Sequence, residues 1–215
     1  MVKYKYVRHN GEENMNEAFS RTEMLLGNEA MSKLKDSKVA VFGVGGVGSF
    51  AVEALVRCGI GKIVLVDKDS IDITNINRQI HATFDTIGRA KTEVMKERVL
   101  SINPEISIET YNMFYNEQTA DNLLSQSYDY VVDAIDTITA KIDLILKCKR
   151  MGIPIISSMG AGNKMDPTAF KVLDIYETSF DPIAKIIRTR LRKEGIDSLK
   201  VVCSTEPPIK SFLCD

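Results

Sequence analysis

The sequence predicts an α/β protein with one doubly wound, mostly parallel sheet and helices on both faces. Three observations carry this prediction. Short apolar segments rich in β-forming residues alternate with segments that have helical apolar spacing. A glycine-rich turn at residues 43–48 directly follows the first of these strands. The chain has 215 residues, 44% of them hydrophobic and 27% charged, which is enough to form one large core.

The most informative unit is the first one, which has the order strand, glycine turn, helix and strand at residues 39–42, 43–48, 49–58 and 63–66. Gly43 permits a tight turn, Gly45 lets the backbone approach a phosphate, and Gly48 lets the helix pack against the strand. Asp67 ends the second strand, 19 residues after Gly48, where a carboxylate can accept from ribose hydroxyls. The unit therefore predicts a Rossmann-like nucleotide site, and a glycine turn without a ligand is the competing interpretation.

The rest of the chain continues the alternation. Helices are expected at 14–34 (one helix, or two broken at Gly27), 88–101, 119–125, 138–151 and 181–193. Strands are expected at 106–111, 128–135, 153–157, at 170–176 as the final strand of the sheet, and from 201 onward. We expect a polar lead-in at 1–17, a single nucleotide-binding domain at 18–208 and a short tail at 209–215.

Composition narrows the class of protein. No apolar run reaches 18 residues, so we expect no membrane-spanning segment. The net charge of −1 predicts no strong global attraction to nucleic acid or membrane, which leaves room for a local basic patch. Four widely spaced cysteines without a CxxC pair predict a reduced, cytoplasmic protein without a zinc knuckle.

Polar residues follow several predicted strands, at the edge where ligands bind in open α/β sheets: Asp67 with Asp69, Asn75 and Arg78 with Lys91, and Asp136. Arg78 and Lys91 fall where triphosphate oxygens would lie, and fixed cations there stabilise a departing pyrophosphate. Asp136 is placed to hold Mg²⁺, which favours carboxylates together with phosphate oxygens. The combination favours ATP over NAD, although singly the cations could be surface charges and Asp136 a helix cap.

Several segments resemble the ThiF/MoeB-type superfamily of ubiquitin-activating-enzyme-like adenylyltransferases: GVGGVGS, the strand-end aspartate, NINRQ, the GRAK lysine and DAIDT. Within it, the chain is similar to the tRNA threonylcarbamoyladenosine dehydratase family. The strings that carry this narrower likeness are FSRTEMLLG (19–27), TNINRQIHA (74–82), GRAKTEVMKERVLSINP (88–104), VVDAIDT (131–137), GAGNKMDPT (160–168), DPIAKIIRTRLRKEGI (181–196) and CSTEPP (203–208). The likeness covers roughly residues 18–208.

The resemblance implies ATP-dependent cyclisation of threonylcarbamoyladenosine beside the tRNA anticodon, through an acyl-adenylate. It also implies a set of site residues: Gly43, Gly45, Gly46 and Gly48 around ATP, Asp67 at its ribose, Asn75, Arg78 and Lys91 at its phosphates, and Asp136 on Mg²⁺. Asp69, paired with Asp67, is a further expected cofactor-binding residue. An N-terminal arginine reaches across a homodimer in this superfamily, and Arg21 is the matching position; a solvated helix residue is the plainer interpretation. The implied partners are tRNA, a second copy of the chain and a sulfur-transfer protein.

Two other functions stay open. The chain could activate the C-terminal glycine of a ubiquitin-like sulfur carrier, although such activators usually carry paired CxxC zinc ligands that are absent here. It could also be a non-catalytic nucleotide-sensing scaffold.

The basic helix with Lys185, Arg188, Arg190, Arg192 and Lys193 is either a solvated face or a contact for tRNA phosphates. Cys203 and Cys214 are better explained as buried or incidental than as nucleophiles.

Overall fold

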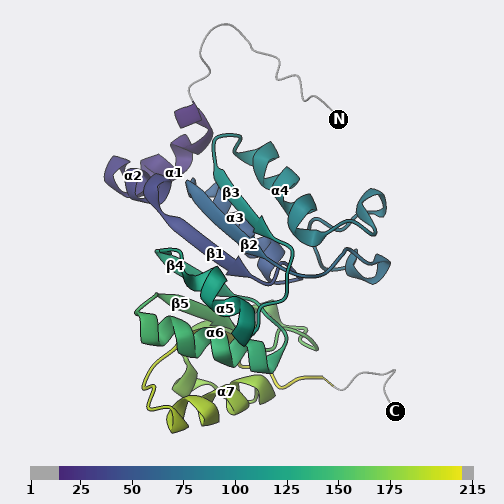
Figure 1. Cartoon of the computed structure of the whole chain (residues 1–215), viewed down its shortest axis with the longest axis vertical. Coiled ribbons are helices and arrows are strands. Elements are labelled where there is room, and N and C mark those ends of the chain that lie inside the picture. The colour runs from purple at the N-terminus through teal and green to yellow at the C-terminus, as the bar shows by residue number, and fades with distance from the viewer. Residues whose placement is uncertain (1–14, 210–215) are drawn as a thin grey trace, which may run out of the picture.

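A seven-stranded sheet runs through the protein in the order β3-β2-β1-β4-β5-β7-β6 (Figure 1). The computed structural model describes residues 15–209. The strands are β1 (Lys38–Phe42), β2 (Lys62–Val66), β3 (Ser107–Tyr111), β4 (Tyr130–Asp133), β5 (Ile155–Ser158), β6 (Phe170–Asp174) and β7 (Lys200–Ser204). All neighbouring strands pair in parallel except β6 and β7, so the predicted fold class is confirmed.

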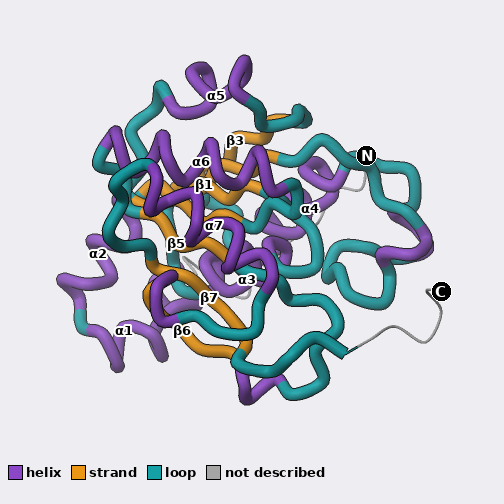
Figure 2. The backbone as a smooth tube through the Cα atoms, turned by 90° about the horizontal axis from the view of Figure 1, so that it is seen from below, coloured by secondary structure: helices purple, strands orange, loops and turns teal. Residues whose placement is uncertain are grey.

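Helices cover both faces of this sheet (Figure 2). They are α1 (Ser20–Leu26), α2 (Asn28–Asp36), α3 (Gly48–Arg57), α4 (Lys91–Ile102), α5 (Glu117–Leu124), α6 (Ile138–Met151) and α7 (Pro182–Lys193). Short 3-10 turns lie at Met15–Phe19, Ile73–Asn75, Phe84–Thr86, Pro167–Ala169 and Ile175–Glu177. None of the helices in the described part of the chain is long and apolar enough to cross a bilayer.

Successive side chains of the central strands pack into two separate cores, because side chains alternate between the two faces of a strand. Val39 and Val41 of β1 pack into one core with α3 and α4. Ala40 and Phe42 pack into the other, with α5, α6 and α7. The strands are therefore apolar on both faces, which explains their continuous hydrophobic runs.

The structure decides between two alternatives for the N-terminal helices, shortens the strand expected at 128–135, and leaves both chain ends largely outside the described residues. The N-terminal helical stretch is two helices, because Gly27 between them has a φ of +80°. The strand expected at 128–135 is shorter, since the carboxylate of Asp133 accepts the Ile135 N–H and turns the chain. The lead-in and tail lie largely outside the described residues, at 1–14 and 210–215.

The prediction that 170–176 is the final strand of the sheet was wrong in one respect. β7 follows it in the chain but inserts between β5 and β6, pairing in parallel with β5. β6 becomes an antiparallel edge strand, with Val172 63% exposed. A half-exposed edge strand and a buried strand have similar local sequences, so their order depends on long-range pairing.

The glycine turn owes its geometry to two close backbone approaches. A Cβ on Gly48 would lie 1.8 Å from the Gly43 carbonyl oxygen, and one on Gly43 would lie 2.5 Å from the Ala134 oxygen. Gly43 also has a φ of +88°, which favours glycine. These contacts let α3 start directly over β1 and bring the turn against the end of β4.

Candidate active site

A cavity of about 640 Å³ opens at the carboxyl ends of β1, β2, β4 and β5. Most of the predicted site residues line it: Gly43, Gly45, Gly46, Asp67, Asp69, Asn75, Arg78, Lys91 and Asp136. The three polar groups expected to converge over the glycine turn therefore do so. Gly48 does not line the cavity and acts instead through the close packing of α3 on the turn.

Asp67 holds the glycine turn in place through its carboxylate. One oxygen accepts the Val44 N–H at 2.6 Å, and the other accepts the Asp69 N–H at 2.8 Å. No side chain caps α3. The Ser49 and Ala51 N–H groups donate to the Gly45 and Val47 carbonyls, whereas those of Gly46, Val47 and Gly48 have no partner among the described residues and can bind an anion. The turn is thus a preformed cradle of backbone donors.

Lys91 and Asp69 form an ion pair on the wall of the cavity. The Lys91 ammonium lies 2.9 Å from the Asp69 carboxylate, and the lysine side chain is only 8% exposed while that of Asp69 is 51% exposed. Lys91 opens α4, and its backbone N–H donates to the Asp69 carbonyl. Backbone and side chain together fix this cation beside the cavity.

The segment that contains Asn75 and Arg78 is held by its own hydrogen bonds. The Asn75 side-chain oxygen accepts the Asp72 N–H at 3.1 Å, closing a capping box. The Arg78 guanidinium donates to the Thr74 carbonyl at 2.8 Å and to Asn77 at 2.9 Å. Arg78 is exposed and carries its charge on the cavity rim without a described carboxylate partner.

Asp136 differs from the other acids of the site because almost nothing in the chain uses its carboxylate. It is exposed, and its one described hydrogen bond comes from the Thr137 hydroxyl at 3.3 Å. The N-cap of α6 is Thr137, and no side chain caps that helix. The helix-cap interpretation of Asp136 is therefore wrong, and its carboxylate stays available to a ligand.

Arg21 lies away from the cavity of its own chain. It is exposed on α1, which Figure 1 places with α2 at the end of the sheet opposite the carboxyl ends of the strands. The neighbouring Phe19 contacts Gly59, just before β2 begins. Arg21 does not line the cavity of its own chain.

The turn is backed by polar groups that have no hydrogen-bond partner within residues 15–209: the Gln79 side-chain oxygen, both His81 ring nitrogens and the Thr92 hydroxyl. Gln79 also lines the cavity. Burial, with the nearby Lys91 and Arg98 charges, lowers the pKa of His81 to about 4. His81 is therefore neutral at physiological pH and is no proton donor for the site.

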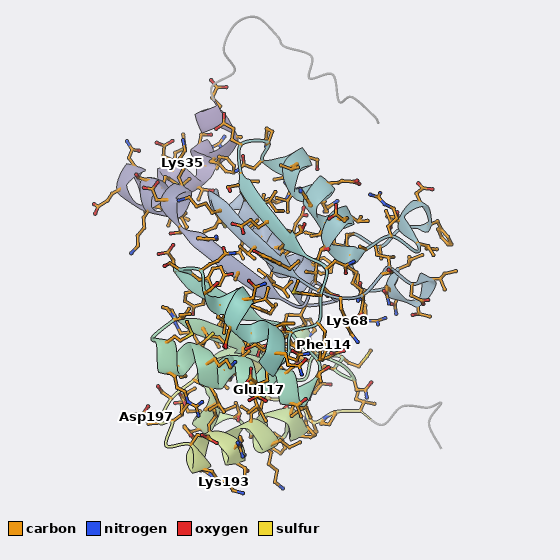
Figure 3. All side chains as sticks on the ribbon, viewed as in Figure 1. Lys35, Lys68, Phe114, Glu117, Lys193 and Asp197 are labelled. Carbon is orange, nitrogen blue, oxygen red and sulfur yellow. The ribbon has the colours of Figure 1, made fainter. Side chains whose placement is uncertain are left out.

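Sequence reasoning missed three residues at the cavity. Lys68 places its ammonium 4.9 Å from the centre of the Phe114 ring, and Figure 3 shows the two side chains together at the ends of β2 and β3. Lys141 lines the cavity floor and is 1% exposed. A signal for Lys141 was present, because it shares the apolar helical positions of Leu144, Ile145 and Cys148.

The basic helix α7 is less available than its sequence indicates. Arg188 donates to the Thr178 carbonyl at 2.8 Å and to its hydroxyl at 2.6 Å, fixing the preceding loop. Arg190 pairs with Glu194 at 2.9 Å, and Arg192 lies over the Tyr176 ring. Lys185 and Lys193 are exposed and make no described ion pair. A solvated face and a contact for tRNA phosphates therefore both stay open for α7, although Arg188 is engaged within the chain.

Cys203 does not contribute a nucleophile to the cavity. Cys203 is 1% exposed within β7, and burial raises the pKa of its thiol. A buried, protonated thiol is a poor nucleophile. Cys214, the other cysteine considered, lies outside the described residues.

Comparison with known proteins places this geometry in a class. A model of the ThiF family matches residues 19–193, and the chain belongs to the ThiF family. Over 192 residues it is 54% identical to the tRNA threonylcarbamoyladenosine dehydratase of Bacillus subtilis, covering 89% of this chain and 76% of that protein. The Escherichia coli dehydratase is 44% identical, with 82% and 66% covered. Within the ThiF family, the chain thus belongs with the tRNA threonylcarbamoyladenosine dehydratases.

Solved structures agree with this placement. E. coli TcdA in complex with ATP superposes with a TM-score of 0.88 at 40% identity, covering 92% of this chain and 85% of that one. E. coli MccB with ATP is more distant, with a TM-score of 0.63 at 30% identity and 75% and 47% covered. The fold predicted from sequence is that of the dehydratase.

Proposed function

We propose that this chain is an ATP-dependent tRNA threonylcarbamoyladenosine dehydratase. The observation that carries the proposal is one cavity that combines a glycine turn, the cations of Arg78 and Lys91, and the little-used carboxylate of Asp136. Relatives named as this enzyme support the substrate. A structure of one of them contains ATP and another contains AMP, the nucleotides expected before and after adenylation.

The reaction would proceed in two steps. The free carboxylate of the threonylcarbamoyl group attacks the α-phosphorus of ATP, so that a C–O–P bond forms and pyrophosphate leaves. The carbamoyl group of the same side chain then attacks the activated acyl carbon and closes a ring, while AMP departs with one oxygen of the original carboxylate and the attacking group loses a proton. The second step is intramolecular and benefits from high effective molarity, so it needs no enzyme nucleophile.

The residues of the cavity suit the first step. The turn from Gly43 to Gly48 and the uncapped start of α3 supply N–H groups to phosphate oxygens. Arg78 and Lys91 would offset the charge that accumulates on departing pyrophosphate. Asp69 holds the lysine ammonium at 2.9 Å, which limits its reorganisation during the step. Asp67 fixes the turn and keeps lone pairs for ribose hydroxyls, and Asn75 lies beside it on the wall.

Asp136 fits a magnesium ion held jointly by protein and nucleotide. Among the described residues no group of three or more metal-ligating side chains comes together, so the protein offers no complete cage. Mg²⁺ in nucleotide sites is bound through one or two carboxylates together with phosphates and water, and Asp136 is exposed on the cavity wall with its carboxylate little used. When bound, the ion would neutralise phosphate charge.

The partners follow from the same reaction. We propose a tRNA substrate, a cytoplasmic location and a homodimer in which Arg21 enters the partner's site. Met24 and Leu25, on the same helix, are 77% and 83% exposed, which is unusual for large apolar side chains and supports an interface there. A sulfur-transfer protein partner rests on the family resemblance alone.

Activation of a ubiquitin-like sulfur carrier is the alternative, and both reactions adenylate a carboxylate. Exchange of labelled pyrophosphate into ATP separates them when each substrate is supplied in turn. We expect exchange with tRNA that carries threonylcarbamoyladenosine and none with a carrier ending in Gly-Gly. Exchange driven only by the carrier would overturn the proposal, and nucleotide binding without exchange would favour a scaffold.

A further inference from the structure

A fully buried ion pair lies beneath the cavity, between α6 and the ends of two strands. Lys141, in the first turn of α6, places its ammonium 2.8 Å from the carboxylate of Asp133, the last residue of β4. The two side chains are 2% and 0% exposed. Neither residue has a role in the chemistry proposed above.

The ammonium makes three contacts and so uses all of its donors. Besides Asp133, it donates to the Ser158 carbonyl at 2.9 Å and to the Ser157 hydroxyl at 3.3 Å. The Ser157 hydroxyl in turn donates to the same Asp133 oxygen at 2.5 Å. The other Asp133 oxygen accepts the Ile135 N–H at 3.1 Å. The network is fully satisfied and joins β4, β5 and α6.

Two segments next to this network line the cavity. Ala134–Thr137 follows β4 and carries Asp136, and Ser158–Gly162 begins at the last residue of β5. Asp136 itself makes only the 3.3 Å contact with Thr137, so its placement depends on the backbone beneath it. That backbone is fixed on one side by Asp133 and on the other by the start of α6, which Lys141 ties to both strands.

Stability alone does not account for a charged pair in this position. Desolvating both ions offsets much of their attraction, so apolar residues of similar volume stabilise a core as well or better. An apolar side chain, however, could not donate to the Ser158 carbonyl. The Lys141 ammonium, by contrast, connects the two loops at the floor of the cavity through hydrogen bonds to Asp133 and to the Ser158 carbonyl.

We propose that Lys141 is a positioning residue for adenylation. Its ammonium sets the separation of the Ala134–Thr137 and Ser158–Gly162 loops and thereby holds Asp136 in place for the nucleotide. The inference rests on the proposed function and adds to it a residue whose three ammonium donors are all used within the protein. Placement errors of about 1 Å can reduce turnover on the order of 100-fold.

The test compares Lys141→Met with the double variant Asp133→Asn/Lys141→Met, which removes both charges and leaves neither buried alone. Lys147→Met is the matched control, because Lys147 also lies on α6 in an ion pair, with Asp121 at the surface. In pyrophosphate release driven by the modified tRNA, we expect the double variant to lose about 10- to 100-fold in kcat with KM for ATP changed less than about twofold. Its thermal midpoint should approach that of the wild type.

Hydrogen exchange supplies a readout that does not depend on turnover. We expect faster exchange within the 134–137 and 158–162 loops of the double variant, and unchanged exchange in β1 and β2. A double variant with wild-type kcat, or with faster exchange across the whole sheet, would overturn the positioning role. If the wild type shows no tRNA-driven release, the proposed function fails, and the loop exchange still decides the structural inference.

Discussion

Two aspartates of one short segment should respond to the same substitution in opposite ways. Asp133→Asn keeps the shape of the side chain but removes the negative charge that faces the Lys141 ammonium at 2.8 Å. The ammonium then stays buried with neutral oxygen acceptors alone, among them those of Ser157 and Ser158, and no carboxylate balances its charge. Asp136→Asn, three residues further on, changes an exposed carboxylate whose one described contact is with Thr137.

The structure sets the size of the two effects. Breaking a buried ion pair by removing one partner costs about 3–5 kcal/mol, and a domain of this size loses about 2–4 °C in Tm per kcal/mol. Asp133→Asn should therefore lower Tm by roughly 6–20 °C. Asp136→Asn should change the free energy of unfolding by less than about 0.5 kcal/mol, as is usual for exposed positions. It should nevertheless abolish turnover, because the proposed metal ligand is lost.

Thermal unfolding followed by calorimetry, together with pyrophosphate release, measures both effects on the same preparations. A loss below about 1 kcal/mol for Asp133→Asn would refute the reasoning about the buried pair, since an unpaired buried charge costs several kcal/mol. Wild-type turnover of Asp136→Asn would remove that residue from the reaction.

Three further predictions concern Lys91, His81 and Arg21. Lys91→Ala should lower the rate of adenylation more than it weakens ATP binding. If a binding titration shows that ATP affinity falls by the same factor as the rate, Lys91 does not stabilise the transition state selectively. The unfolded chain binds a proton on His81 with a pKa near 6.5, but the folded chain does so only near 4, so stability should fall as pH drops through that window. Each pH unit of this pKa difference corresponds to about 1.4 kcal/mol, so the free energy of unfolding should fall by roughly 3 kcal/mol between pH 6.5 and pH 4. The same measurement on His81→Leu should show a smaller fall. Arg21→Ala and Asp136→Asn, each inactive alone, should regain activity when mixed as dimers; no recovery in subunits shown to exchange would contradict a role across the interface.

Local spacing was enough to predict the glycine turn and its acid. The strand from Val39, the glycines and Asp67 lie within one short unit, so their chemistry is readable without knowledge of distant contacts. The meeting of Arg78, Lys91 and Asp136 also followed, because all lie after strands whose carboxyl ends share one edge of the sheet.

What sequence did not reveal depends on contacts between distant segments. Lysine is usually a surface residue, and although Lys141 shares the apolar positions of α6, its charged partner, Asp133 on the adjacent strand, is found only in the folded structure. The Arg188 side chain looked available on a helical wheel, but it binds the Thr178 loop ten residues earlier. The insertion of β7 between β5 and β6 likewise depends on pairing between distant segments, which the sequence of β7 alone does not determine.

Oxygen tracing tests the central claim of carboxylate adenylation most directly. The wild-type chain is incubated with ATP and a tRNA whose threonylcarbamoyl carboxylate is enriched in oxygen-18, and the released nucleotide is analysed by mass spectrometry. The account predicts one labelled oxygen in AMP, together with a cyclised nucleoside lighter by one water. Cyclisation with unlabelled AMP, or release of ADP and phosphate in place of AMP and pyrophosphate, would contradict it.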